Sequence, residues 1–239
     1  MFYIQLICMH TNALKFRHEL KYYITEADYM TIRSRLRNIA GPDPFADENG
    51  IYSIRSLYLE TPGDKVLQEK LTGVRNREKF RIRMYNCDSS FIRLEKKLKI
   101  STATSKVSCL ISREEADNIL SGDIAWMKDA DRELLRELYS KMKFQQLRPK
   151  TIVEYERECF IYKPGNVRVS IDSNIRTGIT NTTKFFETFL PTAKTFGVPV
   201  IIMEIKYDNF LPSIIRAMVQ LPNRRVTAFS KYASARMFG

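Results

Sequence analysis

The sequence predicts an α+β fold, in which eight strands curl into a barrel. Three observations support this fold class. Eight segments alternate as strands do, a helical stretch over residues 112–144 interrupts them, and most strand segments place charged side chains on one face. Because alternate side chains of a strand point to opposite faces of the sheet, a charged face repeated in so many strands indicates the interior of a barrel.

The first predicted element is a strand over residues 16–24, and a helix follows it. Thr25 is a typical helix N-cap residue, with Asp28 three positions later, and the pair Gly41-Pro42 ends the helix. A strand over residues 52–61 ends at a proline-glycine turn.

The middle of the chain continues with a short helix over residues 64–71. Residues 79–98 contain two strands joined by a polar turn, and residues 105–111 form another strand. Ser112 and Glu115 form a capping box for the next helix. The remaining elements are helices over residues 112–122, 131–144, 213–220 and 229–238 and strands over residues 150–162, 166–172 and 200–207.

The length and the hydrophobic pattern limit the class of protein. Without a linker or an internal repeat, residues 16–239 are expected to form one domain after an N-terminal extension, residues 1–15. No segment reaches 18 consecutive apolar residues, so no transmembrane segment is expected. The four cysteines lie far apart and only two histidines are present, which disfavours a zinc site and predicts free thiols in a reducing cytoplasm.

The net charge of +12 predicts an anionic partner. Nucleic acid, a membrane surface or a phosphorylated small molecule would each fit such a charge. The basic residues are dispersed over strands and mixed with glutamates, which disfavours a nucleic-acid surface. Aromatic residues such as Tyr58 and Phe80 are expected to pack on the barrel exterior and against helices, not to stack on bases.

The charged faces consist of alternate strand residues. Arg81 and Arg83 share a face opposite Phe80 and Ile82. The same alternation groups Arg93 with Glu95 and Lys97, Arg168 with Ser170 and Asp172, and Glu204 with Lys206. Each face alone is typical of the solvent side of an antiparallel sheet. Neighbouring cations repel one another, however, unless an anion lies between them, so the set together predicts a cavity that binds a polyanion.

Side chains would have to bind the phosphates, because the sequence contains neither GxxxxGK[ST] nor GxGxxG. The strand motifs resemble a known family when taken in order: "HELKYY", "SLYLET", "KLTG", "KFRIRMY", "FIRLEKK", "VEYERECF", "VRVSID", "MEIKY" and "FSKY". They resemble the VTC domain, the polyphosphate polymerase domain of the vacuolar transporter chaperone complex and its bacterial relatives. The resemblance covers residues 16–238. This family belongs with the triphosphate tunnel metalloenzymes, also called the CYTH-like fold.

The resemblance implies an antiparallel eight-stranded β-barrel with helices packed outside, which forms a basic tunnel. In this tunnel the terminal phosphate of ATP would be transferred to inorganic polyphosphate, with Mn²⁺ or Mg²⁺ as cofactor. By matching motifs, the catalytic residues would be Lys21, Arg81, Arg83 and Lys231. The substrate-binding residues would be Lys70, Lys97, Lys106, Arg157 and Arg168. The metal ligands would be Glu204 together with Glu19 and Glu95, unless these two form ion pairs with lysines.

Three departures from the family pattern are visible. The strand that contains Lys106 is weakly patterned, and the loop before it is short. Ala228 stands where the eukaryotic pattern has a further lysine, three positions before Lys231. The chain lacks the SPX and membrane-spanning regions of the eukaryotic proteins, so coupling to a membrane would need a separate protein.

Two alternative functions stay open at this point. The same tunnel could hydrolyse triphosphate or tripolyphosphate, or cyclise ATP. In the second alternative, the protein is a non-catalytic module that binds polyphosphate or another polyanion.

Overall fold

The structure is a computed structural model that describes residues 17–101, 103–178, 182–196 and 199–238. At its centre is an antiparallel sheet in which eight strands follow one another. In spatial order they are β1 (His18–Ile24), β10 (Ile201–Tyr207), β8 (Val167–Gly178), β7 (Arg148–Tyr162), β3 (Ile51–Glu60), β4 (Arg77–Tyr85), β5 (Asp88–Ile100) and β6 (Ala103–Ile111). All eight predicted strands are therefore confirmed. Two short strands, β2 (Gly41–Pro42) and β9 (Ala193–Lys194), pair with β7 and β8.

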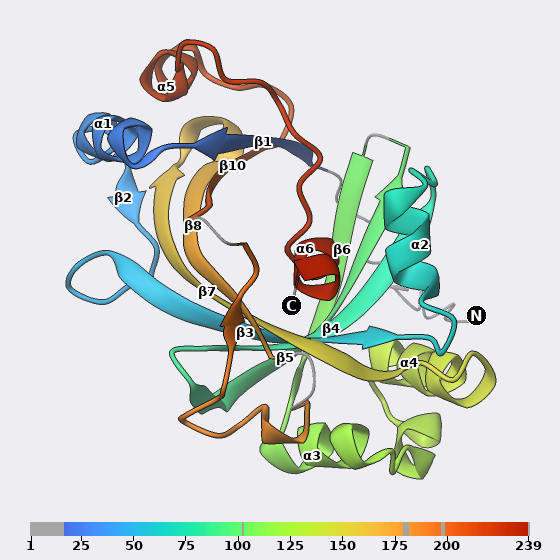
Figure 1. Ribbon diagram of the computed structural model, residues 1–239. Coiled ribbons are helices and arrows are strands. Elements are labelled where there is room, and N and C mark those ends of the chain that lie inside the picture. Colours follow the sequence, from blue (N-terminus) through green and yellow to red (C-terminus); the bar gives the residue numbers. More distant parts are fainter. Residues whose placement is uncertain (1–16, 102, 179–181, 197–198, 239) are drawn as a thin grey trace, which may run out of the picture.

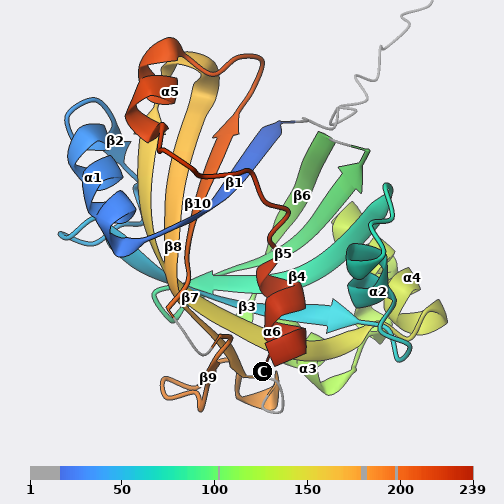
Figure 2. The same ribbon diagram turned by 45° about the horizontal axis from the view of Figure 1, so that its top comes forward.

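The sheet curls around a central space (Figures 1 and 2), with β1, β10, β8 and β7 on one side and β3 to β6 on the other. Its two edges meet at one end, where the backbone N–H of Arg17 donates to the carbonyl of Thr104 at 3.2 Å. The predicted barrel is thus confirmed as a curled sheet whose seam is bridged at this point.

The outward faces of the strands are apolar and are covered by helices. α1 (Glu26–Leu36) and α5 (Ser213–Val219) pack over β8 and β10. α3 (Arg113–Ser121) and α4 (Glu133–Phe144) pack over β4 and β5, where Ile82 and Leu94 are completely buried. Burying one such side chain stabilises a fold by roughly 1.5–3 kcal/mol. Much of the apolar core therefore lies outside the barrel, which leaves the interior for polar residues.

The predicted helix caps are present. The hydroxyl of Thr25 accepts the N–H of Asp28 at 3.2 Å, and the Asp28 carboxylate accepts the N–H of Thr25 at 2.9 Å. Ser112 and Glu115 form the same reciprocal pair before α3. Such a cap stabilises a helix by about 1 kcal/mol.

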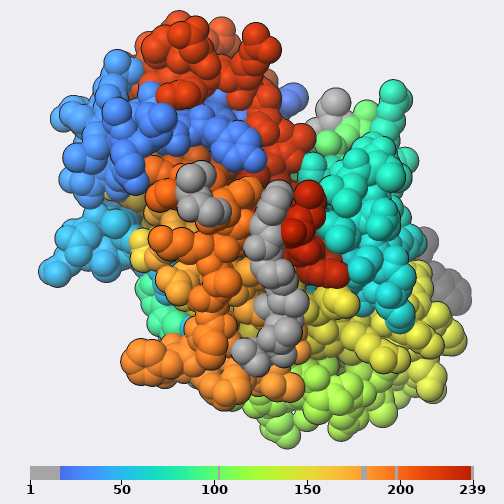
Figure 3. Space-filling view, in the orientation of Figure 1, coloured from blue at the N-terminus to red at the C-terminus, as the bar shows by residue number. Residues whose placement is uncertain are grey.

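One helix departs from the predicted exterior position. α6 (Lys231–Phe238) lies between the two halves of the curled sheet and next to α2 (Lys65–Leu71), as Figures 2 and 3 show. The hydroxyl of Tyr232 on α6 donates to the buried carboxylate of Glu60. The same carboxylate accepts the N–H groups of Val66 and Leu67 in the first turn of α2. Glu60 therefore holds α2 and α6 in place by hydrogen bonds. α6 closes one end of the barrel interior with apolar side chains.

Other expectations concern the chain as a whole. Within the described ranges, no helix is long and apolar enough to cross a membrane. Cys87, Cys109 and Cys159 are free thiols. Cys8 and the expected extension, residues 1–15, lie outside the described residues. The single domain and the cytoplasmic location stay predictions.

Candidate functional site, a cationic cavity inside the barrel

The curled sheet encloses a cavity of about 560 Å³, which we call the tunnel cavity. Fourteen lysine and arginine side chains line it, together with three glutamates. They come from strands on both sides of the barrel and from α2 and α6. All nine basic residues predicted from the sequence lie among them: Lys21, Lys70, Arg81, Arg83, Lys97, Lys106, Arg157, Arg168 and Lys231. The structure thus brings the predicted cations together, while their roles stay predictions.

A first cluster surrounds Glu95 on β5. Its carboxylate lies 2.6 Å from the Arg81 guanidinium, 2.7 Å from the Lys106 ammonium and 3.8 Å from the Arg83 guanidinium. Only 1% of the Glu95 side chain is exposed. Burial would raise the pKa of Glu95, but Arg81 and Arg83 hold it well below its usual range. The carboxylate is therefore ionised and fixes the two arginines on β4.

A second cluster surrounds Asp172 on β8. Its carboxylate accepts two hydrogen bonds from the Arg157 guanidinium, at 2.6 and 2.8 Å, and one from the Lys231 ammonium. Burial would raise the pKa of Asp172, but Arg157 and Lys231 lower it to about 2. Asp172 lies on a charged face that the sequence predicts, although it was not expected as a site residue. Its pairing with Lys231 joins the sheet to the start of α6.

A third cluster contains Glu19 on β1 and Glu204 on β10. The Lys21 ammonium lies 2.6 Å from Glu19 and 3.7 Å from Glu204. Lys97 lies 2.9 Å from Glu19, and Lys206 lies 3.4 Å from Glu204. Burial would raise the pKa of Glu204, but Lys206 and Lys21 keep it well below its usual range. Both carboxylates of this cluster face the tunnel cavity.

Glu19 and Glu204 fit a divalent cation better than Glu95 does. They share Lys21 as a neighbour and face one cavity. Mg²⁺ is commonly held by one or two carboxylates together with substrate phosphates. Glu95 and Glu204 each contact three cations, but Glu95 does not line the tunnel cavity. No group of three or more His, Cys, Asp or Glu residues that could hold a metal occurs in the described part of the chain. The metal roles of Glu19, Glu95 and Glu204, and the cofactor itself, stay predictions.

Lys79 and Tyr58 also belong to the site, although neither is predicted from the sequence as a site residue. Lys79 precedes Arg81 on the inward face of β4, and its ammonium lies 5.2 Å from the centre of the Tyr58 ring. Lys79 forms no ion pair with a carboxylate among the described residues. Burial lowers the pKa of Lys79 to about 7. Burial would raise the pKa of Tyr58, but Arg81 and Lys79 lower it to about 7.

The expected exterior position of Tyr58 is wrong. Its partner in the register of β3 and β4 is Arg81, and paired residues of an antiparallel sheet share a face. The Tyr58 hydroxyl accepts a hydrogen bond from Arg81 at 3.0 Å. β3 is buried on both faces, so alternation of apolar and polar residues could not show which side chains face inward.

Further lining residues could have been found by extending the same alternation. Arg77 precedes Lys79 by two positions on β4, Lys99 follows Lys97 on β5, and Lys206 follows Glu204 on β10. Burial lowers the pKa of Lys206 to about 8. Lys70 donates to the carbonyl of Ala228 at 2.6 Å, so the position that lacks the family's lysine also lines the cavity.

Comparison with known proteins identifies the family. The model of the VTC domain matches residues 16–238, whereas no curated protein matches. A proposed adenylate cyclase from Bacillus halodurans is similar in structure, with a TM-score of 0.51 at 13% identity over 80% of each chain. A proposed adenylate cyclase from Vibrio parahaemolyticus has a TM-score of 0.44 at 11% identity, over 85% of this chain and 82% of that one.

The structural likeness to the Bacillus halodurans protein shows a shared fold, that of the CYTH-like triphosphate tunnel proteins. The family model covers nearly the whole chain, including every strand of the curled sheet. From its family match and its fold, the protein belongs to the VTC domain family and is a polyphosphate-related tunnel protein.

Proposed function

We propose that this protein is a polyphosphate polymerase, which transfers the terminal phosphoryl group of ATP to a growing chain of inorganic polyphosphate and releases ADP. One observation supports the proposal most directly. Fourteen cations and three glutamates line the tunnel cavity, and even when the carboxylates that pair with these cations from outside its lining, Asp43, Glu95, Asp172 and Asp208, are counted, the cations are in excess by seven. Enclosed like charges repel one another unless an anion neutralises them. A chain of phosphates supplies many negative charges in a narrow shape.

The arginines are oriented by their partners before any phosphate binds. Nε and Nη2 of Arg81 point to Glu95, and Nη1 donates to the Tyr58 hydroxyl. Each terminal nitrogen of a guanidinium carries two N–H groups, so Arg81 keeps donors for phosphate oxygens. Arg83 is fixed in the same way by Ser56 and Tyr155, at 3.1 Å each. Donors held in place stabilise developing charge without having to reorganise.

In the proposed transfer, a terminal oxygen of the acceptor chain forms a bond to the γ-phosphorus of ATP. The bond from this phosphorus to the β,γ-bridging oxygen breaks, and its electron pair leaves with ADP. The attacking oxygen is already anionic, so no general base is required. Arg81, Arg83 and Lys231 would stabilise the charge on the transferred group. Loss of one of these arginines is expected to lower the rate by roughly 10²-fold.

Glu19 and Glu204 would hold the divalent cation, Mn²⁺ or Mg²⁺. When bound, such a cation would neutralise part of the charge of the phosphates. Lys21 and Lys97, which contact Glu19, would bind the same phosphates and keep the carboxylates ionised. A cytoplasmic location and a separate membrane protein that takes up the product belong to this proposal as predictions.

Product analysis tests the proposed activity. The purified protein would be incubated with ATP and Mn²⁺, and the products resolved on a gel stained for polyphosphate, with Arg81→Ala alongside. Long chains made by the wild type but not by the variant are expected. Free phosphate without chains would instead assign a triphosphatase of the same fold, and intact ATP would assign a binding module.

A further inference from the structure

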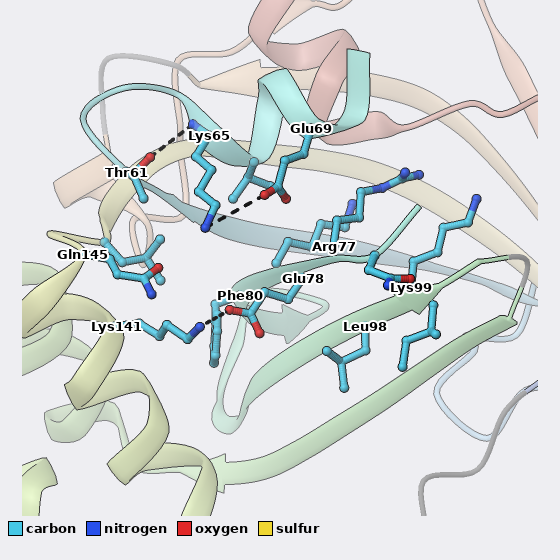
Figure 4. A pocket seen from close by; sticks show the side chains of 15 residues that line it. Thr61, Lys65, Glu69, Arg77, Glu78, Phe80, Leu98, Lys99, Lys141 and Gln145 are labelled. Carbon is cyan, nitrogen blue, oxygen red and sulfur yellow. Dashed lines mark hydrogen bonds and ion pairs between the residues drawn. The ribbon is translucent and has the colours of Figure 1, made fainter. Parts of the chain in front are cut away.

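A second cavity opens beside the tunnel cavity, where β3 and β4 separate. Their pairing runs from Ile54 and Tyr85 to Tyr58 and Arg81, and no further pair follows in the described residues. β3 then leads to α2, while β4 extends away from it back to Arg77. The space between them holds a cavity of about 450 Å³, which we call the side pocket (Figure 4). α2, the ends of β4 and β5, and the end of α4 surround it.

The side pocket adjoins the tunnel cavity at a cationic border. Arg77, Lys79 and Lys99 line both cavities, as does Glu78, whose carboxylate already pairs with Lys96 and Lys141. None of the three forms an ion pair with a carboxylate in the part of the chain that the structure describes. Burial lowers the pKa of Lys99, and Arg77 lowers it further. This border is therefore suited to phosphate groups.

The far end of the side pocket is nearly neutral. Lys141 forms an ion pair with Glu78, and Lys65 lies 3.9 Å from Glu69. Figure 4 shows Lys141 beside Gln145 at this end, with Arg77 and Lys99 at the opposite end. Because the cations at the far end already have carboxylate partners, a phosphate would gain little by binding there.

The walls of the side pocket suit a flat, partly apolar group. Leu98 and Ile100 of β5 contribute half-buried and exposed apolar surface, and Gln145 adds an amide that donates and accepts hydrogen bonds. The edge of β4 from Arg77 to Phe80 has no strand partner on the β3 side in the described residues. A free strand edge offers alternating N–H and C=O groups, which suit the edge of a nucleobase. The volume lies within the range of about 300–1,000 Å³ that small-ligand pockets have.

We infer that the side pocket binds the nucleoside part of ATP, while the phosphates pass between Arg77, Lys79 and Lys99 into the tunnel cavity. This inference rests on the proposed function. Arg77, Lys79 and Arg81 lie two residues apart on one face of β4, which places Arg77 about 14 Å from Arg81 at roughly 3.4 Å per residue. A ribose triphosphate can span that distance. The terminal phosphate would then reach Arg81 and Arg83, where transfer is proposed.

A comparison of two ligands tests the nucleoside site. Dissociation constants for ATP and for tripolyphosphate, which has no nucleoside, would be measured by calorimetry in EDTA so that neither is turned over. Leu98→Trp fills the side pocket, and Gln145→Ala and Ile100→Ala remove single contacts. Val107→Trp is the matched control, because Val107 is a partly exposed valine of the adjacent strand that lines neither cavity.

Leu98→Trp is expected to raise the dissociation constant of ATP by about tenfold or more, because it fills a pocket that fits the ligand. The dissociation constant of tripolyphosphate should stay unchanged. Gln145→Ala and Ile100→Ala should raise the dissociation constant of ATP by a smaller factor and leave that of tripolyphosphate unchanged. These two variants keep the test valid if Leu98→Trp fails to fold. Unchanged ATP affinity in the folded variants, or equal losses for both ligands, would overturn the nucleoside site only. A wild type that binds neither ligand would overturn the proposed function and this inference with it.

Discussion

Glu95 and Arg81 are register partners on β5 and β4, and the Glu95 carboxylate accepts the Arg81 Nε–H at 2.7 Å. The same buried carboxylate contacts Arg83 and Lys106. One negative charge thus holds three positive charges at the wall of the tunnel cavity. It fixes their positions but neutralises them only in part, so the remaining positive charge is available to an anion.

Glu95→Gln is expected to destabilise the protein, and a polyanion is expected to restore much of the loss. Breaking a buried ion pair by removing one partner costs about 3–5 kcal/mol. Because bound phosphates would supply the missing negative charge, tripolyphosphate should raise the melting temperature of Glu95→Gln more than that of the wild type. Scanning calorimetry with and without tripolyphosphate measures this difference.

Glu154→Gln is the control for this rescue. Glu154 pairs with the buried Arg55 at 2.7 Å, and neither residue lines the tunnel cavity. The variant should lose stability without being rescued by tripolyphosphate. Equal rescue of the two variants would mean that the anion acts on net charge and not within the cavity.

Polyphosphate affinity should fall as the pH rises from 7 to 9. Burial lowers the pKa of Lys79 to about 7 and that of Lys206 to about 8 in the free protein. Bound phosphates place negative charge beside these ammonium groups and raise both pKa values, so binding takes up protons. The affinity for polyphosphate is therefore highest below about pH 7. At higher pH it declines by up to tenfold per pH unit for each proton that is taken up on binding.

Calorimetry at pH 8 in two buffers with different ionisation enthalpies measures this proton uptake. Lys79→Arg keeps a permanent charge at this position and should take up fewer protons than the wild type. Proton release, or uptake that is the same in Lys79→Arg, would contradict the account of Lys79.

The Mn²⁺ requirement should depend on Glu19 and Glu204 and not on Glu95. Glu204→Gln and Glu19→Gln remove one negative oxygen donor each, so more Mn²⁺ should be needed for half-maximal activity. Their affinity for tripolyphosphate in EDTA should not fall, since the cavity becomes more positive. A Mn²⁺ titration of activity gives the result, with Glu95→Gln as the comparison. A shift in the Mn²⁺ requirement of Glu95→Gln alone would instead make Glu95 the metal ligand.

Tyr232→Phe tests how α6 is fastened inside the barrel. It removes the hydrogen bond that the buried Tyr232 hydroxyl donates to Glu60 and the one that it accepts from Arg236 at 3.0 Å, and a hydrogen bond to a charged group contributes about 1.5–3 kcal/mol. A loss of this size in the free energy of unfolding is expected from denaturant titration. Tyr139→Phe is the control, because its hydroxyl forms no hydrogen bond within the described residues. Equal losses would show that Glu60 does not hold α6.

The strands and most of the site could be predicted because both depend on the same local pattern. Alternation groups Arg81 with Arg83, and Glu204 with Lys206, wherever the strand lies in the fold. The apolar residues that alternate with them, such as Ile82 and Met203, then face the outer helices. The two-residue strands β2 and β9 are too short to show any pattern.

Features that depend on distant segments could not be predicted. Asp172 meets Lys231 only because α6 enters the barrel, 59 residues further along the chain. Tyr58 lies on a strand that is buried on both faces, so its inward position had no local signal. The side pocket exists because β3 and β4 separate beyond Arg81. No pattern of residue spacing in the sequence predicts this separation.

The most direct test of the central claim is the affinity for inorganic polyphosphate of defined length, measured for the wild type, Arg81→Ala and Lys128→Ala. Lys128 is exposed and lies outside the tunnel cavity, so both variants lose one positive charge. Arg81→Ala should bind about tenfold or more weakly, since a hydrogen bond to a charged group contributes about 1.5–3 kcal/mol, whereas Lys128→Ala should bind as the wild type does. Equal weakening of both variants would show that polyphosphate is attracted by overall charge and does not lie inside the barrel.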